Sequence, residues 1–145
     1  MTAGPPIVAD MTNNSTPITL SDTDKATIRT AAHGAVMLIS FAAVADSPGK
    51  AATKGSLALS SATGPVGHAL AETSKVKLNT KSGAALADQV FPALTASVSL
   101  LGEQDPAEAA NFRDTVLVAV DAATGAQPSP PVAEMVRKIT AALDA

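Results

Sequence analysis

The chain has 145 residues, a net charge of −3 and no cysteine, and hydrophobic residues make up 46% of it. This length and composition indicate one folded domain rather than a disordered polypeptide. The charge gives no basis for nucleic-acid binding, and the lack of cysteine excludes disulfides, thiolate metal sites and thiol catalysis. The 31 alanines, set against three Phe, no Trp and no Tyr, favour helices packed closely through small side chains.

The first elements are a tail and a long helix. Residues 1–20 are rich in Pro, Thr and Asn and lack periodicity, which predicts a flexible tail. Ser21 can cap a helix, and Asp22 and Asp24 suit its positive N-terminal end. The pattern therefore predicts a helix over 22–45, in which Gly34 is tolerated at a cost of about 1 kcal/mol.

The second half of this helix is almost wholly apolar, which admits three interpretations. It is shorter than the roughly 20 apolar residues of a membrane span. A secretion signal would use Lys25 and Arg29 as its basic region and 43–45 as an A-x-A cleavage site, but acidic residues and a long leader precede it. A buried helix, apolar on all sides and covered by neighbours, is the interpretation we favour. Whether residues 1–45 act as an export signal in the cell stays open.

The next segments read as shorter helices. Residues 46–48 form a turn, with Ser47 as a cap and Pro48 as the first helical residue. A helix over 49–62 is expected to place Ala51, Ala58, Leu59 and Ala62 on its inner side. After Gly64-Pro65, a short helix resumes over 66–72, and 74–82 forms a polar connection.

Two long helices and a shorter one complete the chain. Leucine and valine repeat every three or four residues over 83–102, which predicts a helix that Pro92 kinks or breaks. Asp105 caps the next helix over 106–124, Glu108 completes a capping box, and Gly125 ends it. The last helix starts at 129–131 and has one apolar stripe. The residues of that stripe are Val132, Met135, Val136, Ile139 and Leu143.

A shift of 80 residues aligns 36–49 with 116–129 without gaps, which suggests a weak internal repeat. Pro48 then falls on Pro128, and both halves read as an apolar helix, a proline turn and a covering helix. If the repeat is real, the two apolar helices are structurally equivalent and pack on each other.

Residues 38–55 and 100–143 carry a family resemblance. An apolar helix running into Ala-Asp, a short turn and a second helix, followed later by a capped Asp-Pro helix and a Ser-initiated amphipathic helix, resembles the tellurite-resistance B-like (TerB-like) helical family. The resemblance implies a compact helical domain with acidic residues near helix ends, which in some members suggest metal binding. This sequence departs from that pattern, because Ser rather than Gly follows Asp46 and positions 51–54 carry no acidic residue.

The candidate site residues are few. His33 and His68, on neighbouring helices, could share a metal with Asp46 or Asp121, although their spacing matches no metal motif. Solvated or locally hydrogen-bonded imidazoles are the simpler interpretation. Asp121 lies in an apolar run, where pairing with Arg113 or Lys138 would stabilise it. The Gly-x-x-Gly spacing in 64–70 lacks the strand and Lys-Ser/Thr of a phosphate loop.

These observations predict an all-α bundle of five to six helices in one domain over 21–145, with 22–45 and 106–124 at its centre. We expect a cytoplasmic, non-enzymatic binding or interaction module without a cofactor, a membrane span or nucleic acid as partner. It would bind an unknown protein or associate with itself through small-residue faces. The alternatives are a TerB-like metal-binding stress-response protein, with Asp46, Asp121, His33 or His68 as ligands, and a helical pocket for a small apolar ligand.

Overall fold

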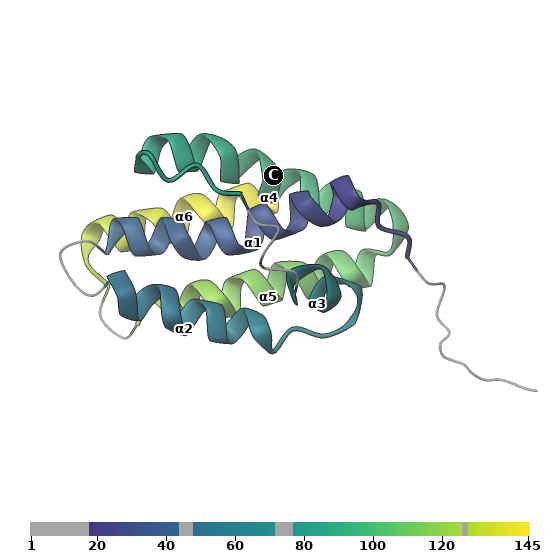
Figure 1. The fold of residues 1–145 in the computed structure, drawn as a ribbon, viewed down its shortest axis with the longest axis horizontal. Coiled ribbons are helices and arrows are strands. Elements are labelled where there is room, and N and C mark those ends of the chain that lie inside the picture. The colour runs from purple at the N-terminus through teal and green to yellow at the C-terminus, as the bar shows by residue number, and fades with distance from the viewer. Residues whose placement is uncertain (1–17, 44–47, 72–76, 126–127) are drawn as a thin grey trace, which may run out of the picture.

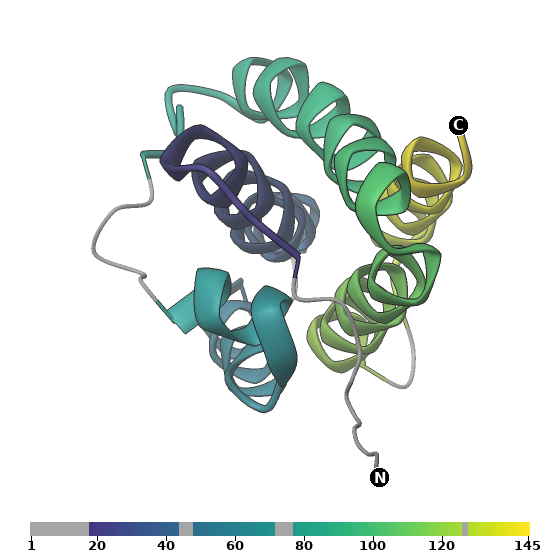
Figure 2. The same ribbon diagram turned by 90° about the vertical axis from the view of Figure 1, so that its right-hand side faces the viewer.

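The computed structural model describes residues 18–43, 48–71, 77–125 and 128–145. These residues form six helices and no strand, and the helices pack into one compact bundle (Figures 1 and 2). The predicted all-α fold is thereby confirmed. The helices are α1 (Asp22–Ala42), α2 (Pro48–Ser60), α3 (Gly64–Ala71), α4 (Gly83–Gln104), α5 (Pro106–Thr124) and α6 (Pro130–Asp144).

Helix α1 begins where the sequence predicted. The Ser21 hydroxyl accepts a hydrogen bond from the Asp24 N–H at 3.0 Å, and the Asp24 carboxylate accepts one from the Ser21 N–H at 3.2 Å. This reciprocal pair satisfies two donors that a helix start otherwise leaves unpaired. Both α1 and α5 contact every other helix, so the two predicted central helices do lie at the centre of the bundle. Asp46 and the cap predicted at Ser47 lie outside the described residues.

Two glycines bring α1 close to its neighbours. A Cβ at Gly34 of α1 would lie 2.3 Å from a Val90 methyl carbon on α4, and a Cβ at Gly55 of α2 would lie 2.5 Å from a Val36 methyl carbon on α1. Both distances are too short for any side chain. The glycines are therefore contact points that let α2 and α4 approach α1, which explains why Gly34 is placed in the middle of a helix.

Asp105 joins α4 to α5 without a loop. Its backbone N–H donates to the Leu101 carbonyl and closes α4, while its carboxylate accepts from the Ala107 N–H at 3.0 Å and caps α5. The predicted capping box with Glu108 is wrong, because the Asp105 N–H that such a box needs already ends α4. The Glu108 carboxylate instead accepts from the Val66 N–H of α3 at 3.4 Å.

Helix α4 continues through Pro92 to Gln104, two residues beyond the predicted end. The ring of Pro92 is exposed, and it lies on the side of α4 opposite a buried stripe that includes Val90 and Leu94. A proline removes the hydrogen bond to the carbonyl four residues earlier, here that of Asp88, which is also exposed. Water can therefore satisfy that carbonyl, and the predicted break does not occur.

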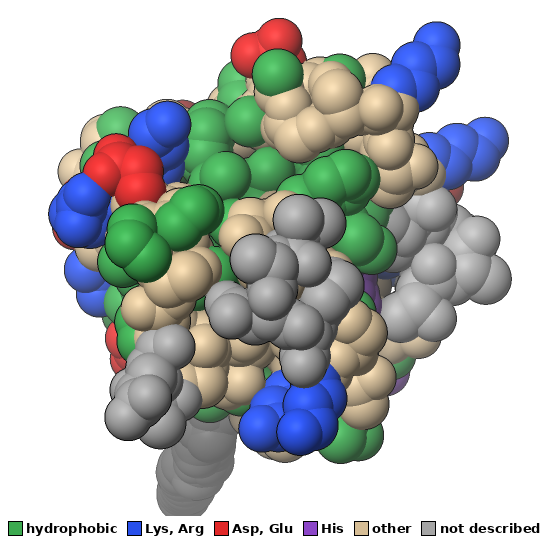
Figure 3. Space-filling model, turned by 90° about the vertical axis from the view of Figure 1, so that its left-hand side faces the viewer, with side chains coloured by type: hydrophobic (Ala, Val, Ile, Leu, Met, Phe, Trp, Pro, Cys, Tyr) green, Lys and Arg blue, Asp and Glu red, His purple; other side chains and the backbone are tan. Residues whose placement is uncertain are grey.

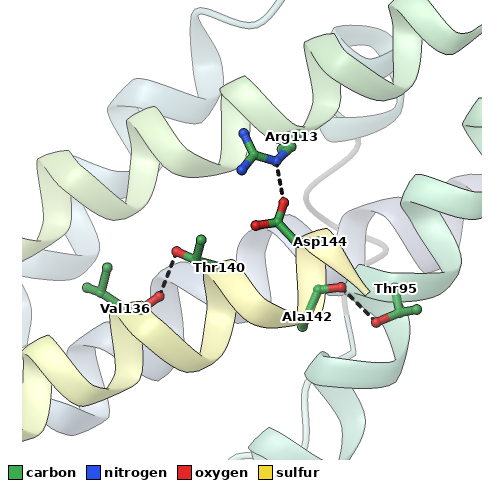
Figure 4. A network of polar contacts seen from close by, with 6 residues as sticks. All are labelled: Thr95, Arg113, Val136, Thr140, Ala142 and Asp144. Carbon is green, nitrogen blue, oxygen red and sulfur yellow. Dashed lines mark hydrogen bonds and ion pairs between the residues drawn. The ribbon is translucent and has the colours of Figure 1, made fainter.

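Helix α6 is attached to α4 and α5 by polar contacts near the C-terminus (Figure 4). The Thr95 hydroxyl of α4 donates to the Ala142 carbonyl at 2.8 Å, and Arg113 of α5 forms an ion pair with Asp144 at 2.8 Å. The predicted apolar stripe of α6 faces the core, with Val132, Ile139 and Leu143 fully buried. These contacts fix the last helix although it has only a single apolar face.

The described start of the chain already contacts the domain. The Thr19 N–H donates to the side-chain oxygen of Gln104 at 2.7 Å, and the Gln104 amide donates back to the Thr19 carbonyl at 2.8 Å. Ile18 and Leu20 pack against the core on either side of this pair. Residues 18–20, which the sequence pattern predicted to belong to the tail, thus hold the start of α1 against the end of α4.

The arrangement of the central helices differs from a simple repeat. Helices α1 and α5 contact each other, as the repeat predicts, but α1 packs most extensively on α4 and α5 on α2. The apolar run of α5 is also not covered on all sides, because the Val118 side chain is 59% exposed. Equivalent sequence positions in the two halves therefore face different surroundings.

Candidate functional site

A cavity of about 550 Å³ lies among α1, α2 and α3. Its volume falls in the range of small-molecule sites. Leu59 and Leu70 are buried, whereas Ser56, Ser60 and Ala71 are exposed, which places the mouth of the cavity on their side. The lining residues are His33 from α1, Ser56, Leu59 and Ser60 from α2, and Gly67, Leu70 and Ala71 from α3.

Small side chains explain why the cavity exists. Helix α3 begins at Gly64, whose φ of 73° lies in the left-handed region that only glycine adopts without strain. This residue lets the chain turn into α3 after the short connection 61–63 that follows α2. Gly67 then passes so close to the Ala62 carbonyl that a Cβ would lie 2.4 Å from its oxygen. The turn that leads into α3 is therefore tight, and Gly67 adds no side chain to the wall of the cavity.

His33 is the titratable group described in the wall of the cavity. Its Nε2 lies 3.1 Å from the Leu70 carbonyl oxygen. Because a carbonyl can only accept, Nε2 carries the proton and Nδ1 keeps its lone pair in the neutral ring. Burial lowers the pKa of His33 below its ordinary value of 6.5, the Leu70 hydrogen bond opposes this shift, and the nearby Arg29 charge adds to it. The imidazole is therefore neutral at pH 7.

Arg29 supports the same end of α3. It lies one turn before His33 on α1, is only 4% exposed, and donates from a terminal guanidinium nitrogen to the Ala69 carbonyl at 3.3 Å. Carbonyls in the last turn of a helix have no partner within that helix. Arg29 and His33 thus satisfy two successive carbonyls of α3, and they fix the helix that closes one side of the cavity.

The predicted metal ligands do not come together among the described residues. His33 lies in the cavity wall, His68 is exposed on α3 and does not line the cavity, and Asp121 is exposed on α5. Asp46 lies outside the described residues. Within the part of the chain that the structure describes, no three His, Cys, Asp or Glu residues gather closely enough to hold a metal ion.

The structure also gives the contacts of Arg113 and of the Gly-x-x-Gly segment, the two other features that the sequence singled out. Arg113, considered as a partner of Asp121, is paired with Asp144, which raises the pKa of Arg113 through a hydrogen bond and charge attraction. The Gly-x-x-Gly segment forms the start of α3, and the Glu108 carboxylate accepts a hydrogen bond from the Val66 N–H in its first turn. An acidic side chain at this position occupies the place where a phosphate would bind, and it would repel one.

The face formed by α2 and α5 carries exposed apolar side chains. Leu57 of α2 is 66% exposed and Val118 of α5 is 59% exposed. A hollow of about 400 Å³ adjoins Leu57, and another of about 190 Å³ adjoins Val118. Figure 3 shows a separate gathering of hydrophobic side chains on the end of the bundle where α1 ends and α2 begins.

Helix α4 is both long and apolar, as membrane-spanning helices are. By length and composition it is the one described helix that could span a bilayer, and 28% of its most apolar stretch is buried in the bundle. Its buried stripe faces the bundle, where α4 contacts α1, α5 and α6, while Asp88 and Glu103 near its two ends are exposed.

No protein-family model, curated protein or solved structure matches this chain.

Proposed function

We propose that this chain is a non-enzymatic helical binding module, and that the cavity among α1, α2 and α3 is its binding site. The observation that carries the proposal is the cavity itself, with its volume of about 550 Å³ and its leucine, alanine and glycine lining. Ligand sites in proteins are typically concave, mostly apolar and equipped with a few polar groups that orient the ligand. His33, Ser56 and Ser60 are those groups here.

The lining defines the class of ligand. No Lys, Arg, Asp or Glu stands among the described lining residues, and the His33 ring is neutral at pH 7. A charged ligand would lose its hydration without gaining a partner, which is costly. The ligand is therefore a small, neutral and largely apolar molecule. It carries one or two groups that can hydrogen-bond to a hydroxyl or to an imidazole.

The same residues argue for binding without catalysis. His33 uses its Nε2–H on a backbone carbonyl, and the described lining contains no carboxylate that could orient the ring as a general base. Ser60 donates its hydroxyl proton to the Leu57 carbonyl at 2.6 Å rather than to an imidazole. Neither serine is paired with a base as a nucleophile requires.

The test combines native mass spectrometry with a neutral apolar dye. Protein purified without added ligand is expected to carry a removable small molecule or, when empty, to bind Nile red with one dye per chain. Ala71→Phe, at the exposed rim of the cavity, is expected to weaken dye binding at least tenfold. His68→Phe places the same ring on the same helix but away from the cavity, and it is expected to leave binding unchanged. Equal binding by both variants would locate the dye elsewhere and overturn the proposal.

A further inference from the structure

We infer that the cavity selects a ligand that donates a hydrogen bond, namely a neutral apolar alcohol or phenol whose hydroxyl group donates to Nδ1 of His33. This inference rests on the proposed function, because it takes the cavity among α1, α2 and α3 as the binding site and specifies the ligand further. It is carried by the way in which the polar groups of the cavity wall already use their own hydrogen-bond donors.

The imidazole of His33 presents a hydrogen-bond acceptor. Its Nε2–H donates to the Leu70 carbonyl at 3.1 Å, which leaves Nδ1 with a lone pair in the neutral ring. In the part of the chain that the structure describes, His33 makes no other side-chain hydrogen bond. Nδ1 is also open to solvent, since it does not belong to the buried side-chain atoms that lack a partner. Because the ring lines the cavity, this lone pair is available to a ligand there.

The two serines of the wall add little donor capacity to the cavity. The Ser60 hydroxyl gives its only proton to the Leu57 carbonyl at 2.6 Å, so its oxygen can only accept a hydrogen bond from a ligand. Ser56 is exposed at the mouth of the cavity, where water can bond to its hydroxyl. Neither serine therefore directs a donor at the space beside His33.

The backbone of the described lining residues offers no donor either. All of them lie in helices, where only the first four N–H groups lack a partner within the helix. Gly67 is the one described lining residue in a first turn, and its N–H donates to the Thr63 carbonyl at 3.2 Å. The hydrogen-bonding capacity left in the wall is therefore mainly that of acceptors, and Nδ1 of His33 is the one on a half-buried side chain.

An open acceptor in an apolar wall determines the class of ligand. A ligand that covers Nδ1 without donating to it displaces water from the lone pair and supplies no hydrogen bond in return. Sites built around such a group discriminate strongly against analogues that lack the matching donor. An amine would be charged and would find no carboxylate among the described lining residues, and an amide would bring a carbonyl for which the wall keeps no donor. A hydroxyl group on an apolar body supplies the donor without a charge or a carbonyl.

The experiment compares two probes that differ in the donor. In 2-methoxynaphthalene a methyl group replaces the hydroxyl proton of 2-naphthol, and the ring system stays the same. The chain has no Trp or Tyr, so naphthalene fluorescence reports binding without interference from the protein. At pH 7.5 the full chain is expected to bind 2-naphthol at least tenfold more tightly, although the methoxy compound is the more apolar. Ala71→Phe is expected to weaken the binding of both probes, which would locate them in the cavity.

Two histidine variants and one spectrum test the assignment to Nδ1. His33→Phe keeps an aromatic ring in the wall but removes Nδ1, and it is expected to bring the two dissociation constants together. His68→Phe makes the same change at an exposed position that does not line the cavity, and it should keep the preference for 2-naphthol. Nitrogen NMR of the wild type needs no variant to fold. The Nδ1 signal of His33 is expected to move upfield with 2-naphthol and not with 2-methoxynaphthalene.

The outcomes separate this inference from the proposed function. Equal binding of the two probes by the wild type, with both weakened by Ala71→Phe, would keep the cavity as the binding site and overturn the preference for a donor. A preference that His33→Phe leaves intact, or a Nδ1 signal that 2-naphthol does not move, would overturn the role of His33. If neither probe nor Nile red binds, the proposed function fails and this inference fails with it.

Discussion

His33 Nε2 lies 3.1 Å from the carbonyl oxygen of Leu70, so the imidazole that helps to line the cavity also holds the last turn of α3 in place. A change in the charge of this ring therefore acts on the fold and on the proposed site together. The direction of that effect follows from the lowered pKa of His33.

Stability is expected to fall when the pH drops below 6.5. An unfolded histidine binds a proton near pH 6.5, whereas burial keeps the folded His33 neutral to a lower pH. Between the folded pKa of His33 and pH 6.5, the unfolded state binds more protons than the folded state, so protonation favours unfolding. The stabilisation is complete above pH 6.5 and is lost as the pH falls toward the folded pKa. The Tm measured between pH 7.5 and 5 should decline for the wild type and for His68→Gln, but more weakly for His33→Gln. An equal decline of Tm with falling pH in all three proteins would contradict the assignment of this pH dependence to His33.

Gly34→Ala is expected to destabilise the bundle by about 1–2 kcal/mol, because overpacking at the α1–α4 contact outweighs the better helix propensity of alanine. A Cβ there would lie 2.3 Å from a Val90 methyl carbon. The same substitution should cost at least about 1 kcal/mol less in a Val90→Ala background. Gly49→Ala, where a Cβ meets nothing within 4 Å, is the control and should not destabilise. Urea denaturation measures the wild type, the two single variants, the double variant and the Gly49→Ala control. Simple additivity of Gly34→Ala with Val90→Ala would be inconsistent with the contact.

Thr95→Val is expected to cost about 0.5–1.5 kcal/mol, because its hydroxyl joins α4 to the Ala142 carbonyl of α6. That carbonyl lies in the last turn of α6, where no helical partner exists. Thr140→Val removes a hydroxyl that only bonds back to Val136 of its own helix, and it should change stability by less than about 0.5 kcal/mol. Chemical denaturation of both variants separates the link between helices from the loss of a hydroxyl. An equal loss of unfolding free energy in Thr95→Val and Thr140→Val would contradict a stabilising role for the bond between α4 and α6.

Gly125→Ala is expected to cost about 1 kcal/mol, because the φ of 78° at the end of α5 is unfavourable for any residue with a Cβ. Gly83→Ala is the matched control, since its φ is not positive and a Cβ there meets nothing within 4 Å. Thermal unfolding should show a lower Tm for the first variant only. A Gly125→Ala protein as stable as the wild type would argue against the left-handed end of α5.

Divalent ions distinguish the TerB-like alternative from the proposed binding module. A metal site predicts a Tm that rises with added Zn²⁺ or Ca²⁺ and falls again on chelation. Because the described residues contain no cluster of metal ligands, we expect the Tm to stay within about 1 °C at 1 mM of either ion. A rise that Asp121→Asn abolishes would favour the metal-binding alternative.

The helix boundaries that the sequence predicts best are those set by local chemistry. The Asp105-Pro106 start and the Gly125 end of α5 agree with the structure, because capping involves residues that are neighbours in the chain. The predicted capping box at Glu108 is wrong because of a contact with a distant part of the chain, which the neighbouring residues in the sequence do not indicate. The Asp105 N–H that the box would use donates to Leu101 of α4, and the Glu108 carboxylate accepts from the Val66 N–H of α3.

The sequence suggested that the bundle contains a cavity but not where the cavity lies. A core short of large side chains already suggested a pocket for an apolar ligand. Its position depends on how α3 folds back over α1 and α2, which is decided by Gly64, by Gly67 and by the two side chains of α1 that hold α3. His33 was considered as a metal ligand, and its hydrogen bond to a backbone carbonyl follows only from the packing of α1 against α3.

The double role of Asp105 fixes the length of the chain at one corner. Since this residue ends α4 and begins α5, no slack exists there to absorb an inserted residue. Each insertion would extend a helix and turn everything beyond it by about 100° with an advance of about 1.5 Å. Apolar faces that now meet the core would then point to solvent. Length variation among natural or engineered versions of this protein should therefore be confined to its other connections.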